Sequence, residues 1–203
     1  MEQMILLKTS SGISQAPLQA KLLSERILCV QGEINADSAC YFVSKLIELN
    51  LESTDEPITV LINSPGGEVS SGLLMYDSIV GSAAPIRTVC LGKACSMGAV
   101  LFMASPQQRL MLPNSELMIH QPLLGGTVSG NASSIRSISD SLLETKDRIN
   151  KLISKHTGKS LQEVDDATSY DHYFSAGEAI DFHLCDRIIT FSELIELLRN
   201  EEE

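Results

Sequence analysis

Ser96 is a polar residue inside the small and apolar stretch GKACSMGAV, residues 92–100. A strand-like run, IRTVCL, precedes it and a helix-like run, MGAVLFMA, follows it. A serine at such a turn can act as a nucleophile if a base takes its proton and donors receive the developing negative charge. Taken alone, however, the stretch favours a serine that caps a helix or packs in the core. It also departs from the GxSxG elbow, because Ala94 occupies the first glycine position.

Two turns could supply backbone amides to such a serine. Met97 stands at the predicted start of a helix, where N–H groups have no partner within the helix. In SPGG, residues 64–67, the pair Gly66 and Gly67 allows positive φ and leaves amides accessible. Most Pro-Gly-Gly stretches are only turns, so this motif is informative only together with Ser96.

The base would have to be a histidine, and the chain has four. His120 follows the apolar run ELMI and precedes Gln-Pro, so we expect it where a strand leaves the core. Asp171 could orient this base, or it could be a loop acid in water. Lys93 is an alternative base, although it lies only three residues before Ser96 on the incoming strand. The residues therefore allow a Ser-His-Asp set without establishing it.

The other three histidines have simpler explanations. His156 and His183 are predicted in the last turns of helices, 133–156 and 176–184, where a charge interaction with the helix dipole accounts for them. His172 is expected in a loop beside Asp171.

Composition narrows the class of protein. The 203 residues have a formal net charge of −11, which argues against nucleic-acid binding because that needs a basic face. The N-terminus, MEQMILLKTS, does not fit a secretory signal, and no apolar run approaches the roughly 18 residues of a membrane span. Five cysteines without a CxxC pair favour reduced thiols over disulfides or metal ligation. We therefore expect a cytoplasmic protein without a metal site.

Strand and helix patterns alternate along the chain, which predicts a single α/β domain, residues 1–203, with crossover connections. The expected strands are 26–34, 56–67, 86–92, 108–114, 116–122 and 186–190. The expected helices are 35–49, 68–80, 96–104, 133–156, 176–184 and 191–200.

Helix 133–156 has one narrow apolar stripe, and Gly158 supplies its C-terminal stop. Such a helix packs either on something beyond its own domain or across its own core, and the sequence favours neither. The stripe follows 3-4-3-4-3 spacing and consists of Ile135, Ile138, Leu142, Thr145, Ile149 and Leu152.

Five motifs occur together along the chain: INSPGG (62–67), GKACSMGA (92–99), LPNSELMIHQP (112–122), HTGKS (156–160) and YDHYFSAGEA (170–179). Their order and approximate spacing resemble those of the proteolytic subunit of the Clp protease (ClpP), and the resemblance runs from about Leu23 to Thr190. It implies a crotonase-like spiral of β-β-α units with a protruding, handle-like helix at 133–156.

The resemblance also implies a serine endopeptidase that needs no cofactor. The family's nucleophile, general base and orienting acid match Ser96, His120 and Asp171, and its oxyanion donors match the amides of Gly67 and Met97. A peptide substrate would lie as an added strand between 66–69 and 122–125. The residues implied in substrate binding are Gly66, Glu68, Val69, Pro122 and Leu123, and Val69, Met97 and Leu123 would face the P1 side chain.

Members of the family form heptameric rings that stack in pairs around a chamber, with helix 133–156 between the rings. A hexameric ATPase unfolds and threads substrates. ATP hydrolysis belongs to that partner, because the present chain has no GxxxxGK[ST] loop.

The chain departs from the family on its surfaces. Tyr170 stands where Arg is usual before the acid, and His172 follows it. Thr59 and Leu61 replace tyrosines near the expected ATPase pocket, and residues 1–22 lack the axial-loop pattern. These departures predict a divergent paralogue that uses another unfoldase, pairs with another ClpP or cleaves only loose chains. The alternatives are a latent ring subunit and a CoA-thioester enzyme of the crotonase fold.

Overall fold

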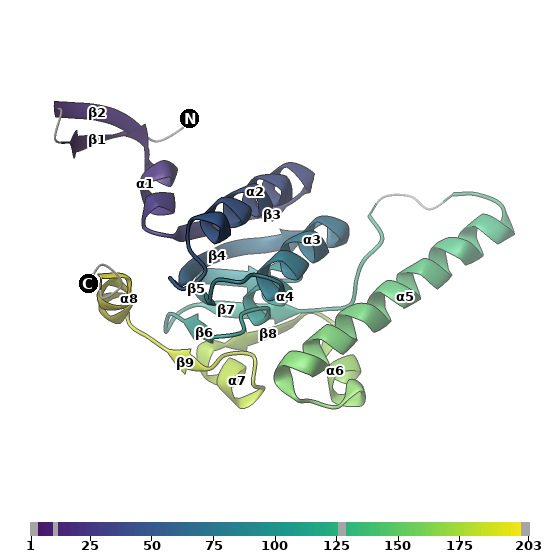
Figure 1. Ribbon diagram of the computed structural model, residues 1–203. Coiled ribbons are helices and arrows are strands. Elements are labelled where there is room, and N and C mark those ends of the chain that lie inside the picture. The colour runs from purple at the N-terminus through teal and green to yellow at the C-terminus, as the bar shows by residue number, and fades with distance from the viewer. Residues whose placement is uncertain (1–3, 10–11, 126–128, 200–203) are drawn as a thin grey trace.

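The computed structural model describes residues 4–9, 12–125 and 129–199. Its body is a layered α/β domain in which five strands form a parallel sheet in the order β3-β4-β5-β6-β9 (Figure 1). Parallel neighbours need crossover connections, and helices supply them here. The strands are β3 (Ile27–Ile34), β4 (Ile58–Gly67), β5 (Ile86–Cys95), β6 (Gln108–Met111) and β9 (Arg187–Ile188).

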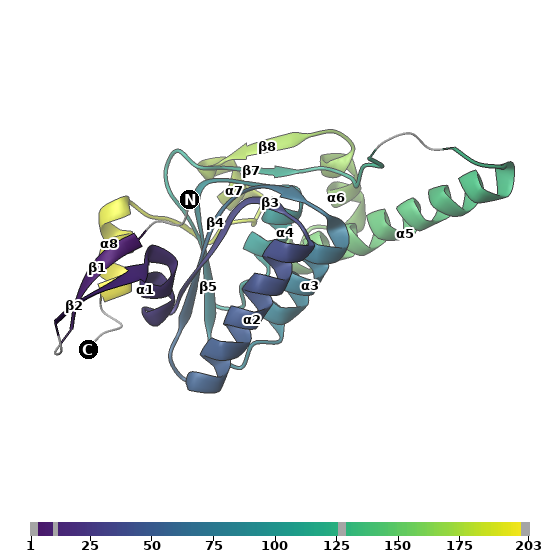
Figure 2. The same ribbon diagram turned by 90° about the horizontal axis from the view of Figure 1, so that it is seen from above.

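Three helices cover one face of this sheet, as the view from above shows (Figure 2). The inward side chains of β4, such as Ile58, Val60 and Ile62, are fully buried beneath them. The other face carries a smaller apolar cluster to which the C-terminal helix α8 (Phe191–Arg199) contributes Leu194. The covering helices are α2 (Ala36–Glu52), α3 (Val69–Val80) and α4 (Met97–Met103).

Two short strands extend the sheet at the carboxyl end of β5. β7 (Glu116–Ile119) lies parallel to the end of β5, and β8 (His172–Ser175) pairs antiparallel with β7. The sequence patterns predict β7, but they place His172 in a loop, and that expectation is wrong. A four-residue strand carries too little periodicity to be seen alone, and pairing with β7 is what makes it a strand.

The long helix is α5 (Ala132–Thr157), capped at its start by the Asn131 side chain and ended by Gly158 at φ 70°. Its C-terminal half packs on the body, where Ile149 and Ile153 are buried. Its N-terminal half projects away from the body (Figure 1), and Ile135 there is 46% exposed. Packing across its own core is therefore confirmed for the C-terminal half, whereas the outer half of the stripe is left exposed on the single chain.

The sequence patterns miss several further elements. A hairpin of β1 (Met4–Thr9) and β2 (Gly12–Pro17) leads into α1 (Leu18–Ser24), and a short helix α6 (Leu161–Thr168) follows α5.

Helix α7 (Ala176–Asp181) is shorter than expected. The amides of Leu184 and Cys185 turn back to the carbonyl of Ala179, and His183 adopts φ 64°, so the prediction of His183 within a helix is wrong.

His156 lies in the last turn of α5, as predicted, but its role differs. Its Nε2 lies 2.7 Å from the Tyr76 hydroxyl on α3, and the two rings meet edge to face. Burial, with smaller contributions from Lys155 and Arg109, lowers the pKa of His156 from 6.5 to about 4. A neutral ring cannot complement the helix dipole, so the dipole explanation is wrong; the ring joins α5 to α3 instead.

We therefore predict an acid-sensitive step in stability. Because the folded-state pKa lies below the unfolded value, unfolding takes up a proton between about pH 6.5 and pH 4, and stability falls as the pH falls through that window. After allowance for solvent screening, the loss from pH 7 to pH 5 should be about 1 kcal/mol in urea denaturation. His156→Gln should remove that part of the loss. The exposed His172 serves as control: an equal loss in His156→Gln and His172→Gln would contradict the prediction.

Candidate active site

Ser96 occupies a strained turn between β5 and α4. Its backbone has φ 54° and ψ −124°, a combination that is rare and costly for a residue with a Cβ. Ser96 N donates to Met118 O at 2.8 Å, which ties the turn to β7. Ser96 holds the N-cap position of α4, but its hydroxyl makes no capping bond. The capping role that the local stretch favours is therefore wrong for the side chain.

The register of β5 and β7 brings His120 to this turn. The two strands run parallel with Cys95 beside Met118, so the residues that follow them emerge at the same edge. His120 leaves β7 directly after Ile119, as expected for a residue at the end of a strand. Its Nε2 lies 2.9 Å from Ser96 Oγ, within hydrogen-bond distance.

The antiparallel pairing of β7 with β8 brings the acid to the same place. Ile119 pairs with His172, so the next residues outward, His120 and Asp171, face each other across the two strands. His120 Nδ1 lies 3.1 Å from Asp171 Oδ1. His172 itself stacks on Phe174, with ring centroids 4.2 Å apart. The structure thus joins Ser96, His120 and Asp171 in one hydrogen-bonded row.

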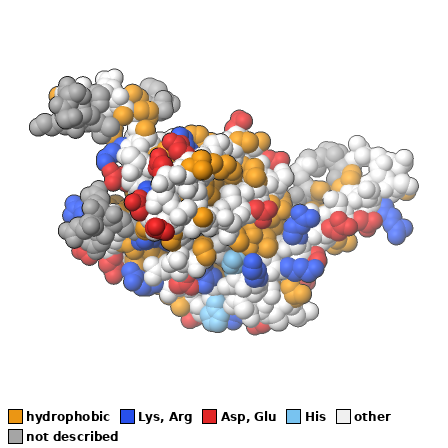
Figure 3. All heavy atoms as spheres, viewed as in Figure 1, with side chains coloured by type: hydrophobic (Ala, Val, Ile, Leu, Met, Phe, Trp, Pro, Cys, Tyr) orange, Lys and Arg blue, Asp and Glu red, His pale blue; other side chains and the backbone are white. Residues whose placement is uncertain are grey.

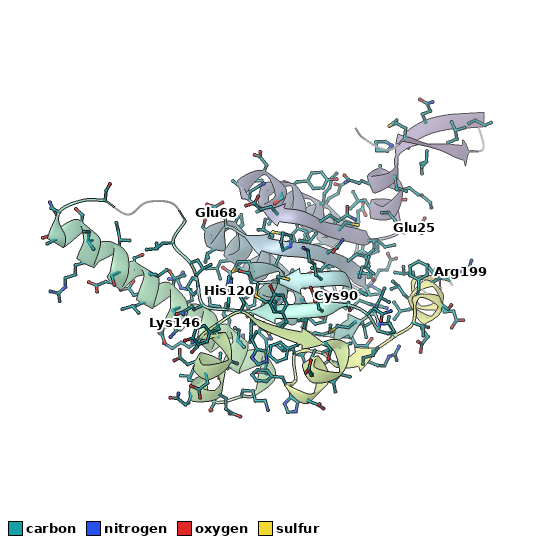
Figure 4. The ribbon with its side chains drawn as sticks, turned by 180° about the vertical axis from the view of Figure 1, so that it is seen from behind. Glu25, Glu68, Cys90, His120, Lys146 and Arg199 are labelled. Carbon is teal, nitrogen blue, oxygen red and sulfur yellow. The ribbon has the colours of Figure 1, made fainter. Side chains whose placement is uncertain are left out.

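Helix α6 (Leu161–Thr168) and the residue after it support the His120 and Asp171 segments of this row. Gln121 N donates to Thr168 O at 2.8 Å, and Gln121 Nε2 donates to Ser169 O at 3.1 Å. These bonds fix the segment after His120 and the segment before Asp171 to each other. Lys146 on α5 forms an ion pair with Asp165, N to O 2.6 Å, which holds α6 against the long helix. Figure 4 shows His120 between Lys146 and Glu68.

The turn at Gly66 and Gly67 lies directly against the Ser96 turn. A Cβ at Gly66 would lie 2.6 Å from Cys95 O and 2.7 Å from Ser96 Cβ, so only glycine allows this approach. A Cβ at Gly67 would lie 2.1 Å from Ile34 O. Glu68 N donates to that same Ile34 carbonyl at 2.8 Å. Gly67 therefore lies directly against the end of β3.

A small apolar pocket opens beside Ser96 and His120. Val69, Met97 and Pro122, all expected near the substrate, contribute to its wall. The base of α5 contributes two more residues that the sequence did not assign to the site, although Ile149 belongs to the predicted stripe. A stripe shows which residues share a face but not what that face covers. The remaining lining residues are Val100, Ile119, Ile149 and Ile153.

The other expected substrate residues lie around this pocket. Leu123 is 73% exposed and lines a wider groove between residues 122–124 and α5. Glu68 accepts hydrogen bonds from Ser71 Oγ at 2.6 Å and Ser70 Oγ at 2.9 Å, which lower the pKa of its carboxyl group. Gly66 is buried against the Ser96 turn.

Two neighbouring side chains, Lys93 and Cys95, are less suited to act as base or nucleophile than His120 and Ser96. Lys93 is exposed and lies across from Glu116 in the ladder, whereas the Ser96 hydroxyl meets His120. Burial raises the pKa of the Cys95 thiol, which favours its protonated, unreactive form.

Within the described residues no cluster of His, Cys, Asp or Glu could hold a metal ion. In the same part of the chain, no helix combines the length and apolarity needed to cross a bilayer.

The fold and the row of Ser96, His120 and Asp171 define an α/β protein with the side-chain arrangement of serine hydrolases. A family model described as Clp protease matches residues 10–192, and the chain belongs to that family. It is therefore a ClpP-type protein, and its parallel sheet with covering helices is consistent with the ClpP fold that the resemblance implied. The family consists of peptidases whose subunits generally assemble into rings.

The contact between the two turns predicts a strong effect of Gly66→Ala. The new Cβ would overlap Cys95 O and Ser96 Cβ at a residue with φ 91°, so the free energy of unfolding should fall by about 2–4 kcal/mol. Gly177→Ala is the matched control, since no atom lies within 4 Å of its added Cβ and it sits in helix α7. Urea denaturation should show an unchanged or higher stability for the control. Equal effects of the two substitutions would refute the close contact.

Proposed function

We propose that the protein is a serine endopeptidase that hydrolyses peptides and unfolded proteins inside a ring-shaped chamber. The observation that carries the proposal is the 2.9 Å distance from Ser96 Oγ to His120 Nε2, with Asp171 3.1 Å from the other ring nitrogen. This geometry matches a nucleophile, a general base and an orienting acid.

The proposed reaction begins with His120 in the tautomer that carries its proton on Nδ1. That N–H donates to the Asp171 carboxylate, and Nε2 accepts the Ser96 proton as Oγ attacks the peptide carbonyl. The amides of Gly67 and Met97 stabilise the oxyanion. His120 then gives the proton to the leaving amine as the C–N bond breaks. Water, activated by the same ring, hydrolyses the acyl-enzyme and restores Ser96.

The substrate would bind as an extended strand between residues 66–69 and 122–125. Main-chain hydrogen bonds would then supply most of the affinity, which explains tolerance of different sequences. The apolar pocket of Val69, Met97 and Pro122 supports an apolar side chain next to the scissile bond. Leu123, on the rim of the adjoining groove, would contact the same or a neighbouring side chain.

The ring assembly is supported by apolar side chains that one chain leaves exposed. Figure 3 shows such side chains gathered over α2 and α3, and they include Ile47, Leu51, Leu74 and Val80. The projecting half of α5 adds Ile135 and Leu143. Contiguous exposed apolar surface is typical of an interface. We propose heptameric rings stacked in pairs, with α5 between the rings.

Protein degradation would need a Clp-type ATPase or a ClpP paralogue as partner. Thr59 and Leu61, which stand where the family usually has tyrosines, support an altered docking surface. Thr59 is only 1% exposed, and Leu61 packs against the apolar cluster that also contacts Leu198 of α8. The partner would hydrolyse ATP and unfold the substrate protein, while the present chain would hydrolyse the unfolded polypeptide that the partner delivers.

The proposal predicts that Ser96→Ala abolishes both peptide hydrolysis and labelling by a fluorophosphonate. The expected fall in kcat is about 10⁴–10⁶-fold, because the nucleophile is lost. Asp171→Asn should lower kcat by up to about 10⁴-fold, since it disturbs the tautomer of His120. Fluorogenic peptides measure kcat, and Ser192→Ala, an exposed serine on helix α8 that does not line the site, is the control.

Labelling that survives in Ser96→Ala would exclude Ser96 as the nucleophile. A correctly folded wild type that neither labels nor cleaves would favour the latent ring subunit. Hydration of an enoyl thioester by the wild type would favour the crotonase alternative.

The assembly makes a separate prediction. Sedimentation at micromolar concentration should show a species several times the 22.1 kDa mass of the chain. Leu74→Asp should shift it towards the monomer, because it places a charge in the apolar face of α3, where Leu74 is 46% exposed. Leu161→Asp, at a similarly exposed leucine on α6, is the control. A monomeric wild type would contradict the ring.

A further inference from the structure

Ser64 is a buried hydroxyl that the reaction above does not use. It lies on β4 two residues before Gly66 and has no exposed surface. Its Oγ accepts a hydrogen bond from Gly66 N at 3.0 Å and donates one to Gly32 O at 2.6 Å. The hydroxyl therefore bridges the glycine turn and the neighbouring strand β3.

Both of its partners lie where the sheet is irregular. The register of β3 and β4 shifts between Gln31 and Glu33, and Gly32 between them has φ 72°. The register of β4 and β5 shifts between Ile62 and Ser64. At such shifts the regular ladder does not supply every bond, and a buried N–H or C=O left unpaired is costly. The Ser64 hydroxyl replaces the missing ladder at this point.

The same residue touches both segments that carry the proposed oxyanion donors. Gly66 continues into the peptide whose N–H belongs to Gly67. On the other side, the start of α4 rests on Ser64, because a Cβ at Gly98 would lie 3.1 Å from Ser64 O. A shift at Ser64 would thus change the separation between the amides of Gly67 and Met97.

We infer that Ser64 is a positioning residue that sets the geometry of the oxyanion site. The inference rests on the proposed function, because it assumes that Gly67 and Met97 stabilise an oxyanion. Ser64 acts through the Gly66–Gly67 peptide and does not contact the substrate. Its loss should therefore weaken stabilisation of the tetrahedral intermediate while leaving binding of the ground-state peptide intact.

The test compares Ser64→Ala and Ser64→Cys with the wild type on a fluorogenic peptide. Both variants should lower kcat by roughly 10–10²-fold with KM within about twofold, as expected when one oxyanion donor is misplaced. Affinity for a peptide boronate, which forms a tetrahedral anionic adduct, should fall by a similar factor. KM reports binding of the ground-state peptide, and kcat and boronate affinity report stabilisation of the tetrahedral anion. The cysteine variant leaves no cavity, and its larger sulfur bonds only weakly, so it provides a second test of the hydroxyl if alanine destabilises the turn.

Ser105→Ala is the matched control. Ser105 is also a buried serine whose Oγ donates to a carbonyl, Ile86 O at 2.8 Å, and accepts from an amide, Gln108 N at 3.1 Å. It lies at the opposite end of the sheet from Ser96, so its loss should lower stability without changing kcat.

The inference is overturned if folded Ser64→Ala and Ser64→Cys keep kcat and boronate affinity within about twofold of the wild type, or if Ser105→Ala loses kcat to the same extent. These outcomes differ from a failure of the proposed function, in which Ser96→Ala would retain hydrolysis or the wild type would have none.

Discussion

The rest of the site depends on a backbone contact that admits no side chain. Gly66 lies against Cys95 O and Ser96 Cβ at distances that a Cβ could not occupy. The contact brings the end of β4 and the end of β5 together, and with them the amide of Gly67 and the turn that holds Ser96. Without it, the turns that follow these two adjacent parallel strands would be separated by at least the normal strand spacing of about 4.8 Å.

The sheet itself sets the positions of the other two side chains. His120 reaches Ser96 because β7 runs beside the last residues of β5, and Asp171 reaches His120 because β8 runs back along β7. Ladder hydrogen bonds fix such registers to one residue, since a slip by one would turn every side chain to the opposite face. The strained φ of Ser96 is held by the hydrogen bond that its backbone N–H donates to Met118 O and by the contact with Gly66.

Helix α5 links the site to the surface that other copies would cover. Its base is buried, carries Ile149 and Ile153 into the apolar pocket, and is joined to α3 through His156 and Tyr76. Its outer half projects and leaves apolar residues exposed. One continuous helix thus connects the wall of the proposed substrate pocket with the proposed contact between rings.

The sequence by itself determined the order of motifs that marks the family, the main strands and helices, and local signals such as the Gly158 stop, which is present in the structure. These features depend on residues close along the chain. The tertiary structure decided that the Ser96 hydroxyl meets His120 rather than capping a helix, that His156 is neutral, and that residues 172–175 form a strand. The tertiary structure also decided the role we infer for Ser64, because the sequence Asn-Ser-Pro-Gly-Gly alone does not indicate such a role. Each of these depends on burial or on a hydrogen bond between segments far apart in the chain, and no local pattern records such a bond.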